Sequence, residues 1–174
     1  MTVEEIAIRA GVSKVTIYKW WPEKLALAVD AFLSDITTTV QAPDTGSVAE
    51  DLRRHVRSAA RFYTGPAGRV FGHLIAEGQG NSKVAQTFRE RFLDARRKAI
   101  REIFDHGVAR GELRTDVDAN IAIDLIMGAM TYRLLAGHEP LNDKFANLLV
   151  ETVLRGCLIN RNYQRSNRKR RAND

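Results

Sequence analysis

The sequence has little that could brace a fold covalently or carry the chain into a membrane. Its 174 residues include one cysteine, Cys157, and four prolines. A single cysteine excludes an intrachain disulfide and fits a reducing compartment, so we expect a cytoplasmic protein. The longest uncharged apolar stretch of note, Leu125–Tyr132, is far shorter than the roughly 20 residues that span a bilayer. The first residues carry two acids, so we expect neither a membrane span nor a signal peptide.

The chain also lacks the short motifs of the common catalytic and metal-binding classes. It contains no G-x-x-x-x-G-K-[ST], no G-x-S-x-G and no H-E-x-x-H. No two of its four histidines are four residues apart, and the lone cysteine has no cysteine partner for a metal. We therefore expect no enzymatic activity, no metal and no cofactor.

Positive charge is concentrated at one end of the chain. The net charge is +6, but residues 161–174 contain six basic residues and one acid and so account for +5 of it. This segment has one aromatic side chain and no aliphatic one larger than alanine. We therefore expect a disordered basic tail, which is either simply solvated or binds phosphate without specificity. The rest of the chain is almost neutral, so an argument for nucleic-acid binding has to come from a motif.

Helical periodicity dominates the sequence. Hydrophobic residues make up 44% of it, and a chain of this size buries roughly 70% of its unfolded surface, so a core forms without covalent support. No segment alternates with the period of a strand, which predicts an all-α fold. Expected helices cover 2–10, 14–20, 22–36, 47–63, 69–77, 82–106, 118–136 and the stretch from Phe145 to Cys157.

Two of these expected helices begin with capping-box spacing. Thr2 precedes Glu5, and Ser47 precedes Glu50, by three residues, so each hydroxyl could accept from a free amide while the carboxylate reaches back. Gly11 is placed to end the first helix in the left-handed conformation. Pro22 occupies a favourable first position for the third helix.

The first two helices and the glycine between them have helix-turn-helix spacing. The turn would let the second helix, Lys14–Trp20, enter a DNA major groove, which admits one helix. Polar side chains at its start, such as Lys14 and Thr16, can bond to base edges and phosphates. Lys24 opens the next helix, where its charge and the helix amides could meet a phosphate.

The segment TVEEIAIRAGVSKVTIYKWWPEKLALA resembles the DNA-binding part of TetR-family transcriptional regulators. It follows their pattern, roughly T-x-x-x-I-A-x-x-A-G-V-S-x-x-T-[LI]-Y-x-x-[FW]-x-x-K-x-x-L, without a gap from Thr2 to Leu25. The resemblance implies that this segment contacts double-stranded DNA through Thr2, Ser13, Lys14, Val15, Thr16, Tyr18, Lys19 and Lys24. It also implies a small core formed by Ile6, Ala7, Ala10, Val12, Ile17 and Leu25.

In the family, another helix precedes this motif and packs across it, whereas Met1 stands directly before Thr2 in this sequence. We therefore expect a DNA-binding end without that helix, with fewer packing partners for Ile6 and Ile17 and weaker DNA binding. Restoring upstream residues is expected to tighten binding. If specific DNA binding has been lost, the alternative is a dimer that binds a ligand or a protein.

A second stretch, RGELRTDVDANIAIDLIMGAMTYRLLAGHEPL at 110–141, resembles the regulatory domain of one branch of the same family. The resemblance implies a homodimer that binds a palindromic operator and responds to a small-molecule effector, most often as a repressor. The expected organisation is a DNA-binding region at 1–36, a ligand-binding and dimerisation domain at 37–160 and the tail at 161–174. The expected dimer interface contains Ile126, Met130, Leu134, Phe145, Leu149 and Val153.

Aromatic and methionine side chains on the helical stripes are candidates for a pocket that binds a hydrophobic or amphipathic ligand. Such side chains belong to a core more often than to a pocket, so this expectation rests on less than the DNA-binding one. The candidate pocket residues are Phe62, Phe71, Leu74, Phe88, Phe92, Met127, Met130 and Tyr132.

Overall fold

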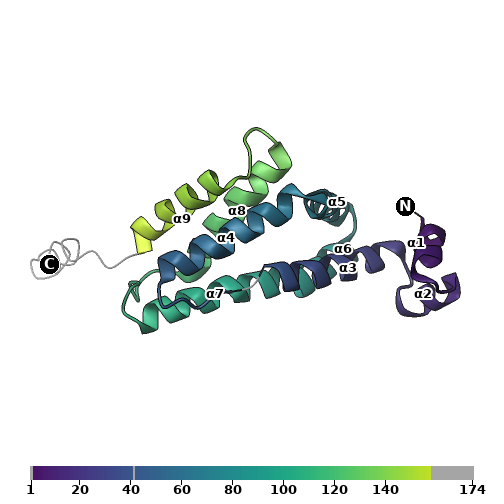
Figure 1. Ribbon diagram of the computed structural model, residues 1–174, viewed down its shortest axis with the longest axis horizontal. Coiled ribbons are helices and arrows are strands. Elements are labelled where there is room, and N and C mark those ends of the chain that lie inside the picture. The colour runs from purple at the N-terminus through teal and green to yellow at the C-terminus, as the bar shows by residue number, and fades with distance from the viewer. Residues whose placement is uncertain (1, 41, 158–174) are drawn as a thin grey trace, which may run out of the picture.

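The computed structural model describes residues 2–40 and 42–157, and over these residues the protein is helical with no strand, as the periodicity predicts (Figure 1). The tail expected at 161–174 lies outside the described residues. The helices are α1 (Val3–Ala10), α2 (Lys14–Trp20), α3 (Lys24–Thr39), α4 (Val48–Thr64), α5 (Pro66–Gly80), α6 (Ser82–Phe88), the π-helical turn η1 (Arg89–Leu93), α7 (Asp94–Ala109), α8 (Ala119–Ala136) and α9 (Asp143–Cys157).

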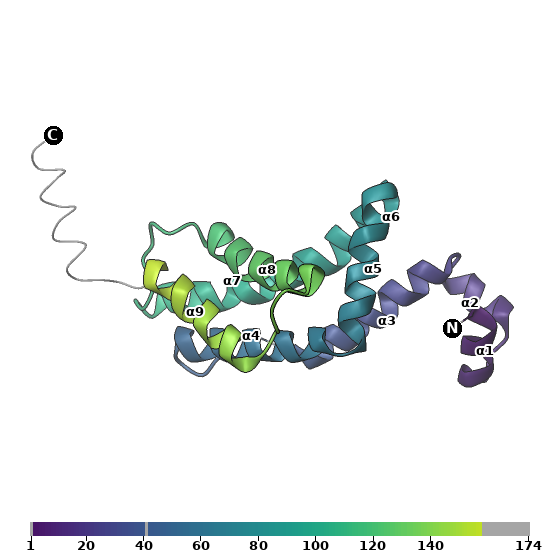
Figure 2. The same cartoon turned by 90° about the horizontal axis from the view of Figure 1, so that it is seen from above.

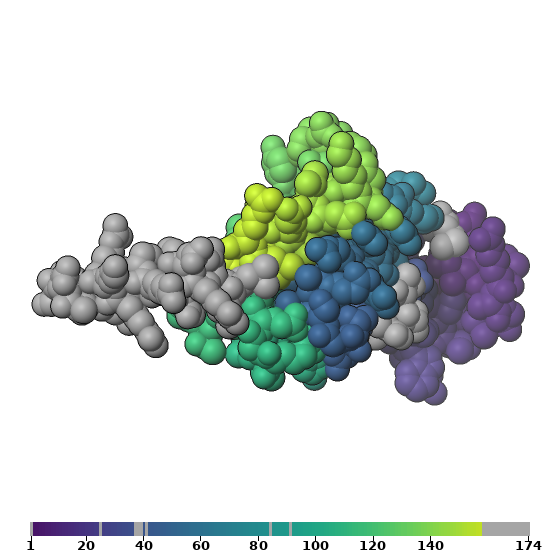
Figure 3. Space-filling model, turned by 60° about the vertical axis from the view of Figure 1, so that its left-hand side comes forward, coloured from purple at the N-terminus to yellow at the C-terminus, as the bar shows by residue number. Residues whose placement is uncertain are grey.

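The molecule is elongated, with the two short helices α1 and α2 at one end and a helical bundle making up the rest (Figures 1 and 2). Helix α3 leads from α2 into the bundle, where it packs against α4 and α5. Helix α4 is central, since it contacts α5, α7, α8 and α9. The space-filling view shows the α1–α2 end, in purple, at one side of the molecule (Figure 3).

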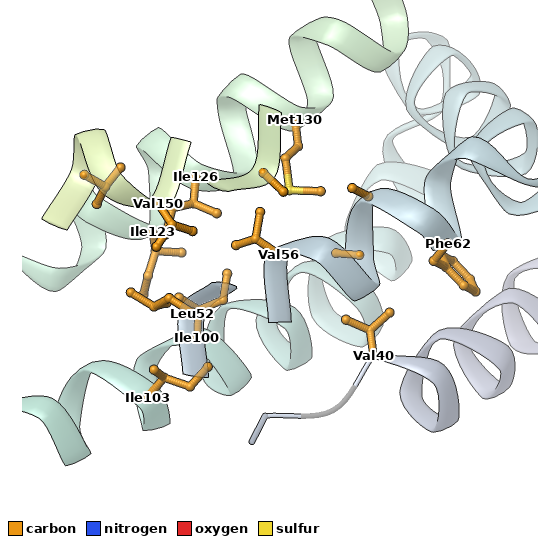
Figure 4. Close-up of a cluster of buried hydrophobic side chains, with 14 of the residues drawn as sticks. Val40, Leu52, Val56, Phe62, Ile100, Ile103, Ile123, Ile126, Met130 and Val150 are labelled. Carbon is orange, nitrogen blue, oxygen red and sulfur yellow. The ribbon is translucent and has the colours of Figure 1, made fainter. Parts of the chain in front are cut away.

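The core of the bundle is built around the apolar face of α4. Leu52 and Val56, one turn apart, are completely buried. They lie between Ile123 and Ile126 of α8 on one side and Ile100 of α7 on the other (Figure 4). Burying a side chain of this size contributes about 1.5–3 kcal/mol, so α4 holds the bundle together.

A second part of the core is aromatic and joins α3 to the bundle. Phe32 of α3 packs against Phe92 of η1, with ring centroids 5.2 Å apart. Phe71 of α5 lies 5.4 Å from Phe92, and Phe88 stacks on Phe92 at 4.8 Å. Tilted and edge-on arrangements such as these are favourable, so these aromatic contacts hold the middle of α3 against the bundle.

The first expected capping box is confirmed and the second is wrong. The amide of Glu5 donates to Thr2 Oγ1 at 3.2 Å, and the amide of Thr2 donates to Glu5 Oε2 at 2.7 Å. Ser47 does precede α4, but its side chain makes no capping bond. The amide of Val48 instead donates to Glu112 Oε2 at 2.9 Å, so a residue distant in sequence replaces the local cap.

Three other helix boundaries differ from expectation. Helix α3 begins at Lys24 with Glu23 as its cap, so Pro22 precedes the helix. Helix α5 is longer than the expected 69–77. Pro66 is well suited to the first turn of a helix, and burial of Phe71 offsets the low helix propensity of the glycines in α5. The long helix expected at 82–106 is interrupted by η1, a π-helical turn that the apolar stripe did not reveal.

Candidate nucleic-acid interface and buried cavity

A tight turn separates α1 from α2. Gly11 ends α1 with a φ of 66°, the left-handed conformation expected of a C-terminal glycine. Ser13 then caps α2, its Oγ accepting from the amide of Thr16 at 3.1 Å. Three residues separate the two helices, so α2 starts in a new direction and one of its faces is exposed to solvent.

Few side chains hold this end together. Val3 and Ala7 of α1 and Ile17 of α2 form one small buried cluster between the two helices. The indole nitrogen of Trp21 donates to Asp30 Oδ2 at 2.7 Å, which ties the end of α2 to α3. The α1–α2 unit is therefore connected to α3 by a small core and by this partly buried hydrogen bond.

The expected core of the motif is only partly present. Ala7 and Ile17 are buried and Ile6 is half-buried, as expected. Ala10 and Val12 were expected inside but are exposed, because no described part of the chain covers them and the small core is formed by Val3, Ala7 and Ile17 instead. The side chain of Leu25 is outside what the structure describes.

All the expected DNA contacts lie at this end and are accessible to solvent. Val15 is 78% exposed and Tyr18 47%, while Ile17 between them points inward. Large apolar side chains grouped on an exposed face indicate an interaction surface. The exposed set is Thr2, Ser13, Lys14, Val15, Thr16, Tyr18, Lys19 and Lys24.

One of these side chains has a partner that the sequence did not predict. Lys14 Nζ forms an ion pair with Glu4 Oε1 of α1, across the turn. The hydrogen bond and the charge of Lys14 lower the pKa of Glu4, and Glu4 raises the pKa of Lys14. The pair therefore holds an acid at the edge of the candidate DNA-binding face.

The bundle contains a small cavity between α4, α5, α7 and α8. Its volume is about 30 Å³, room for one or two water molecules. Apolar side chains form most of its wall, and polar groups of α4, α7 and α8 form the remainder. The lining consists of His55, Val56, Ala59, Tyr63, Phe71, Arg96, Ile100, Ile126, Met127, Met130 and Thr131.

Arg96 of α7 is the most unusual residue of this lining, because its side chain is only 6% exposed. Its Nη1 donates to the carbonyl oxygen of Val40 at 2.7 Å. Its Nη2 lies 2.7 Å from Nε2 of His55, itself buried. A guanidinium only donates, so His55 Nε2 accepts. Burial lowers the pKa of Arg96, and it raises the pKa of Tyr63, whose hydroxyl stays neutral.

The cavity includes three of the eight candidate pocket residues, Phe71, Met127 and Met130. The other expectations need correction. Tyr132 is 66% exposed and points to solvent. Phe62, Leu74, Phe88 and Phe92 are buried in the core and do not line this cavity. Sequence reasoning missed His55 and Arg96, because a histidine and an arginine far apart in the chain gave no motif.

The expected dimer interface is also partly wrong. Ile126, Met130 and Val153 are buried inside the protomer, so a second copy cannot contact them. Leu134, Phe145 and Leu149 are half-buried. The exposed apolar residues of α8 are different ones, and with Gly128 they are spaced alternately four and three residues apart. They are Ile121, Leu125, Tyr132 and Leu135.

No group of three or more histidine, cysteine or acidic residues able to hold a metal ion is found in the described residues. Cys157 is free and buried, and burial raises the pKa of its thiol.

Residues 42–153 match the family model described as "Tetracyclin repressor-like, C-terminal domain". The chain is 42% identical over 156 residues to YdeS of Bacillus subtilis, described as an uncharacterized HTH-type transcriptional regulator; the match covers 90% of this chain and 79% of that protein. It is 28% identical over 156 residues to a DNA-binding transcriptional repressor, TetR, of Mycobacteroides abscessus, covering 88% of this chain and 80% of that one.

The fold is similar to a solved crystal structure, that of the TetR family transcription regulator SCO0332. The TM-score is 0.82 with 38% sequence identity, and the match covers 89% of this chain and 86% of that one.

Proposed function

Because the chain belongs to the TetR family of DNA-binding transcriptional regulators, whose members are not enzymes, we propose that it is a cytoplasmic repressor. It binds a palindromic operator as a homodimer and leaves it when a small hydrophobic or amphipathic molecule binds. The single observation that carries this proposal is the exposed face of α2, held at the end of the molecule by the turn at Gly11.

The side chains on that face suit a major groove. Thr16 and Lys14 can bond to base edges, and exposed Val15 offers an apolar surface for a thymine methyl. Lys24, at the first turn of α3, places a charge beside free helix amides, which suits a phosphate. Tyr18 and Lys19 lie where they can reach the backbone. Base contacts supply the specificity and phosphate contacts the orientation.

The exposed stripe of α8 supports the homodimer. Leu125 is 56% and Tyr132 66% exposed, and Gly128 between them leaves open space where a side chain would stand. A two-fold partner is the commonest cover for such a stripe. By length and composition alone α8 could also cross a membrane, but its inner face with Ile126 and Met130 is buried in the bundle, and we assign its apolar outer face to a second copy.

The small cavity supports the ligand response, since its methionines can rearrange around a guest. Repression is supported by the described role of the Mycobacteroides abscessus relative. The proposed operator is palindromic because two α2 helices related by a two-fold axis would read two half-sites, one or more helical turns apart.

Selection of bound duplexes from a random pool tests this function. The proposal predicts enrichment of a two-fold symmetric sequence, with half-sites about 10 base pairs apart or a multiple of that. Recovery of no enriched sequence, with the protein folded and dimeric, would contradict it. Enrichment of a single unpaired half-site would support sequence recognition by α2 but contradict binding to DNA as a dimer.

A further inference from the structure

The structure buries a positive charge without a negative one. Arg96 is 6% exposed, and both of its recorded partners are neutral acceptors, the carbonyl oxygen of Val40 and Nε2 of His55. None of the described acids forms an ion pair with it. A buried charge is costly unless a counter-charge and hydrogen bonds compensate it, so this site favours an incoming anion.

The surroundings of Arg96 fit an acid group joined to an apolar body. His55, whose Nε2 lies 2.7 Å from the guanidinium, and Tyr63 line the cavity with Arg96, and Phe71, Met127 and Met130 give it apolar lining. The existing volume of about 30 Å³ accommodates a head group and no more. Methionine side chains are unbranched and flexible, so they can yield to a larger apolar body.

Resting on the proposed function, we propose that the effector is an amphipathic organic carboxylate, and that Arg96 is the residue that receives its acid group. The guanidinium can hold a carboxylate through two parallel N–H···O bonds. The apolar body lies against Phe71, Met127 and Met130. A neutral ligand of the same shape lacks the compensating charge and binds more weakly.

The same contact links the cavity to the DNA-binding end. Val40 caps the C-terminus of α3, and Arg96 holds its carbonyl oxygen (Figure 4 shows Val40 below α4). The N-terminal half of α3 carries Leu27 of the small α1–α2 core and Asp30, which binds Trp21. When Arg96 turns to a carboxylate, its bond to Val40 is given up and the end of α3 is released. Ligand binding and the position of α2 are then coupled through one helix, because the ligand favours one of two arrangements.

Calorimetric titration of the full chain without DNA tests the ligand class directly. The probes are octanoate and 3-phenylpropanoate, each paired with its primary amide, which keeps shape and removes the charge. We expect at least one acid to bind about tenfold or more tightly than its amide, since hydrogen bonds to charged groups are the stronger ones. Equal affinities within both pairs, or no binding of either acid, would overturn the proposal.

Two variants separate a ligand-binding role of Arg96 from a purely structural one. Arg96→Gln is expected to abolish the preference for acid over amide, and Arg96→Lys to keep part of it, because lysine retains the charge without the two-pronged geometry. An unchanged preference in Arg96→Gln would overturn the assignment to Arg96. If Arg96→Gln does not fold, the wild-type comparison of acid and amide still decides the ligand class.

The readout on DNA is kept separate from the binding readout. With the selected operator, the acid that binds is expected to lower operator affinity of the wild type and its amide to have little effect. Acid binding without any operator binding would contradict the proposed function and leave the ligand class standing. Operator binding that the bound acid does not change would contradict the link through Val40.

Discussion

Lys14, the first residue of α2, forms an ion pair with Glu4 in the first turn of α1. The pair lies at the edge of the candidate DNA-binding face, so it opposes DNA in two ways. It occupies a lysine that could contact a phosphate, and it places a carboxylate near one. Glu4→Gln removes both effects, and we expect operator affinity to rise by about threefold or more at low salt, with less gain at high salt because the effect is electrostatic.

The control for Glu4→Gln is Glu151→Gln on α9. Glu151 forms a comparable exposed ion pair with Arg155, but α9 lies in the bundle, away from α1 and α2 (Figure 1). Fluorescence anisotropy with a labelled operator measures both variants. Equal effects of the two substitutions would show that the gain is a matter of net charge and not of position.

Lys24 is expected to contact a phosphate and no base. Lys24→Ala should therefore weaken binding of operator and scrambled duplexes by similar factors and reduce the slope of log affinity against log salt by about one per protomer. Lys98→Ala, an exposed lysine of α7, is the matched control and should change neither quantity. A loss confined to the operator would instead place Lys24 at a base edge.

The dimer depends on the exposed stripe of α8. Leu125→Lys places a charge in its middle, and we expect the dimer dissociation constant to rise about thirtyfold or more, as for a central interface residue. Val108→Lys, at an exposed apolar position on α7, is the control. Sedimentation velocity measures the association, and circular dichroism confirms that the helices persist. A dimer of unchanged stability would move the interface to another face.

Gly68 sits where α5 passes close to the end of α4. A Cβ atom there would lie 1.9 Å from the carbonyl oxygen of Tyr63 and 3.1 Å from Leu134 Cδ1. Gly68→Ala is therefore expected to lower the free energy of unfolding by about 1–3 kcal/mol or more. Gly80→Ala, at the open end of the same helix, meets no atom within 4 Å and should leave it nearly unchanged. Urea denaturation compares the two, and equal losses would contradict the close approach.

The sequence predicted best where the determinants are local. The cap at Thr2, the glycine at 11 and the bounds of α2 follow from neighbouring residues, and the structure confirms each of them. It predicted least where tertiary packing decides. Helix α8 is apolar almost all round, so its pattern could not tell the face with Ile126 and Met130, which turns inward, from the face with Leu125, which is exposed.

The polar part of the cavity escaped prediction for a related reason. Arg96 and His55 come from two helices and Val40 from the end of a third, and charged or polar residues in the middle of a helix are usually on its surface. Their meeting depends on how α3, α4 and α7 pack. In the same way, Glu112 reaches the start of α4 and replaces the local cap expected from Ser47.

The measurement that tests the account most directly is fluorescence anisotropy of the 174-residue chain on duplexes taken from beside its own gene, against a scrambled duplex, over a series of salt concentrations. The account predicts tight binding to one natural duplex, with a steep dependence on salt and a clear preference over the scramble. Weak binding that is equal on both duplexes would contradict sequence-specific recognition by α2.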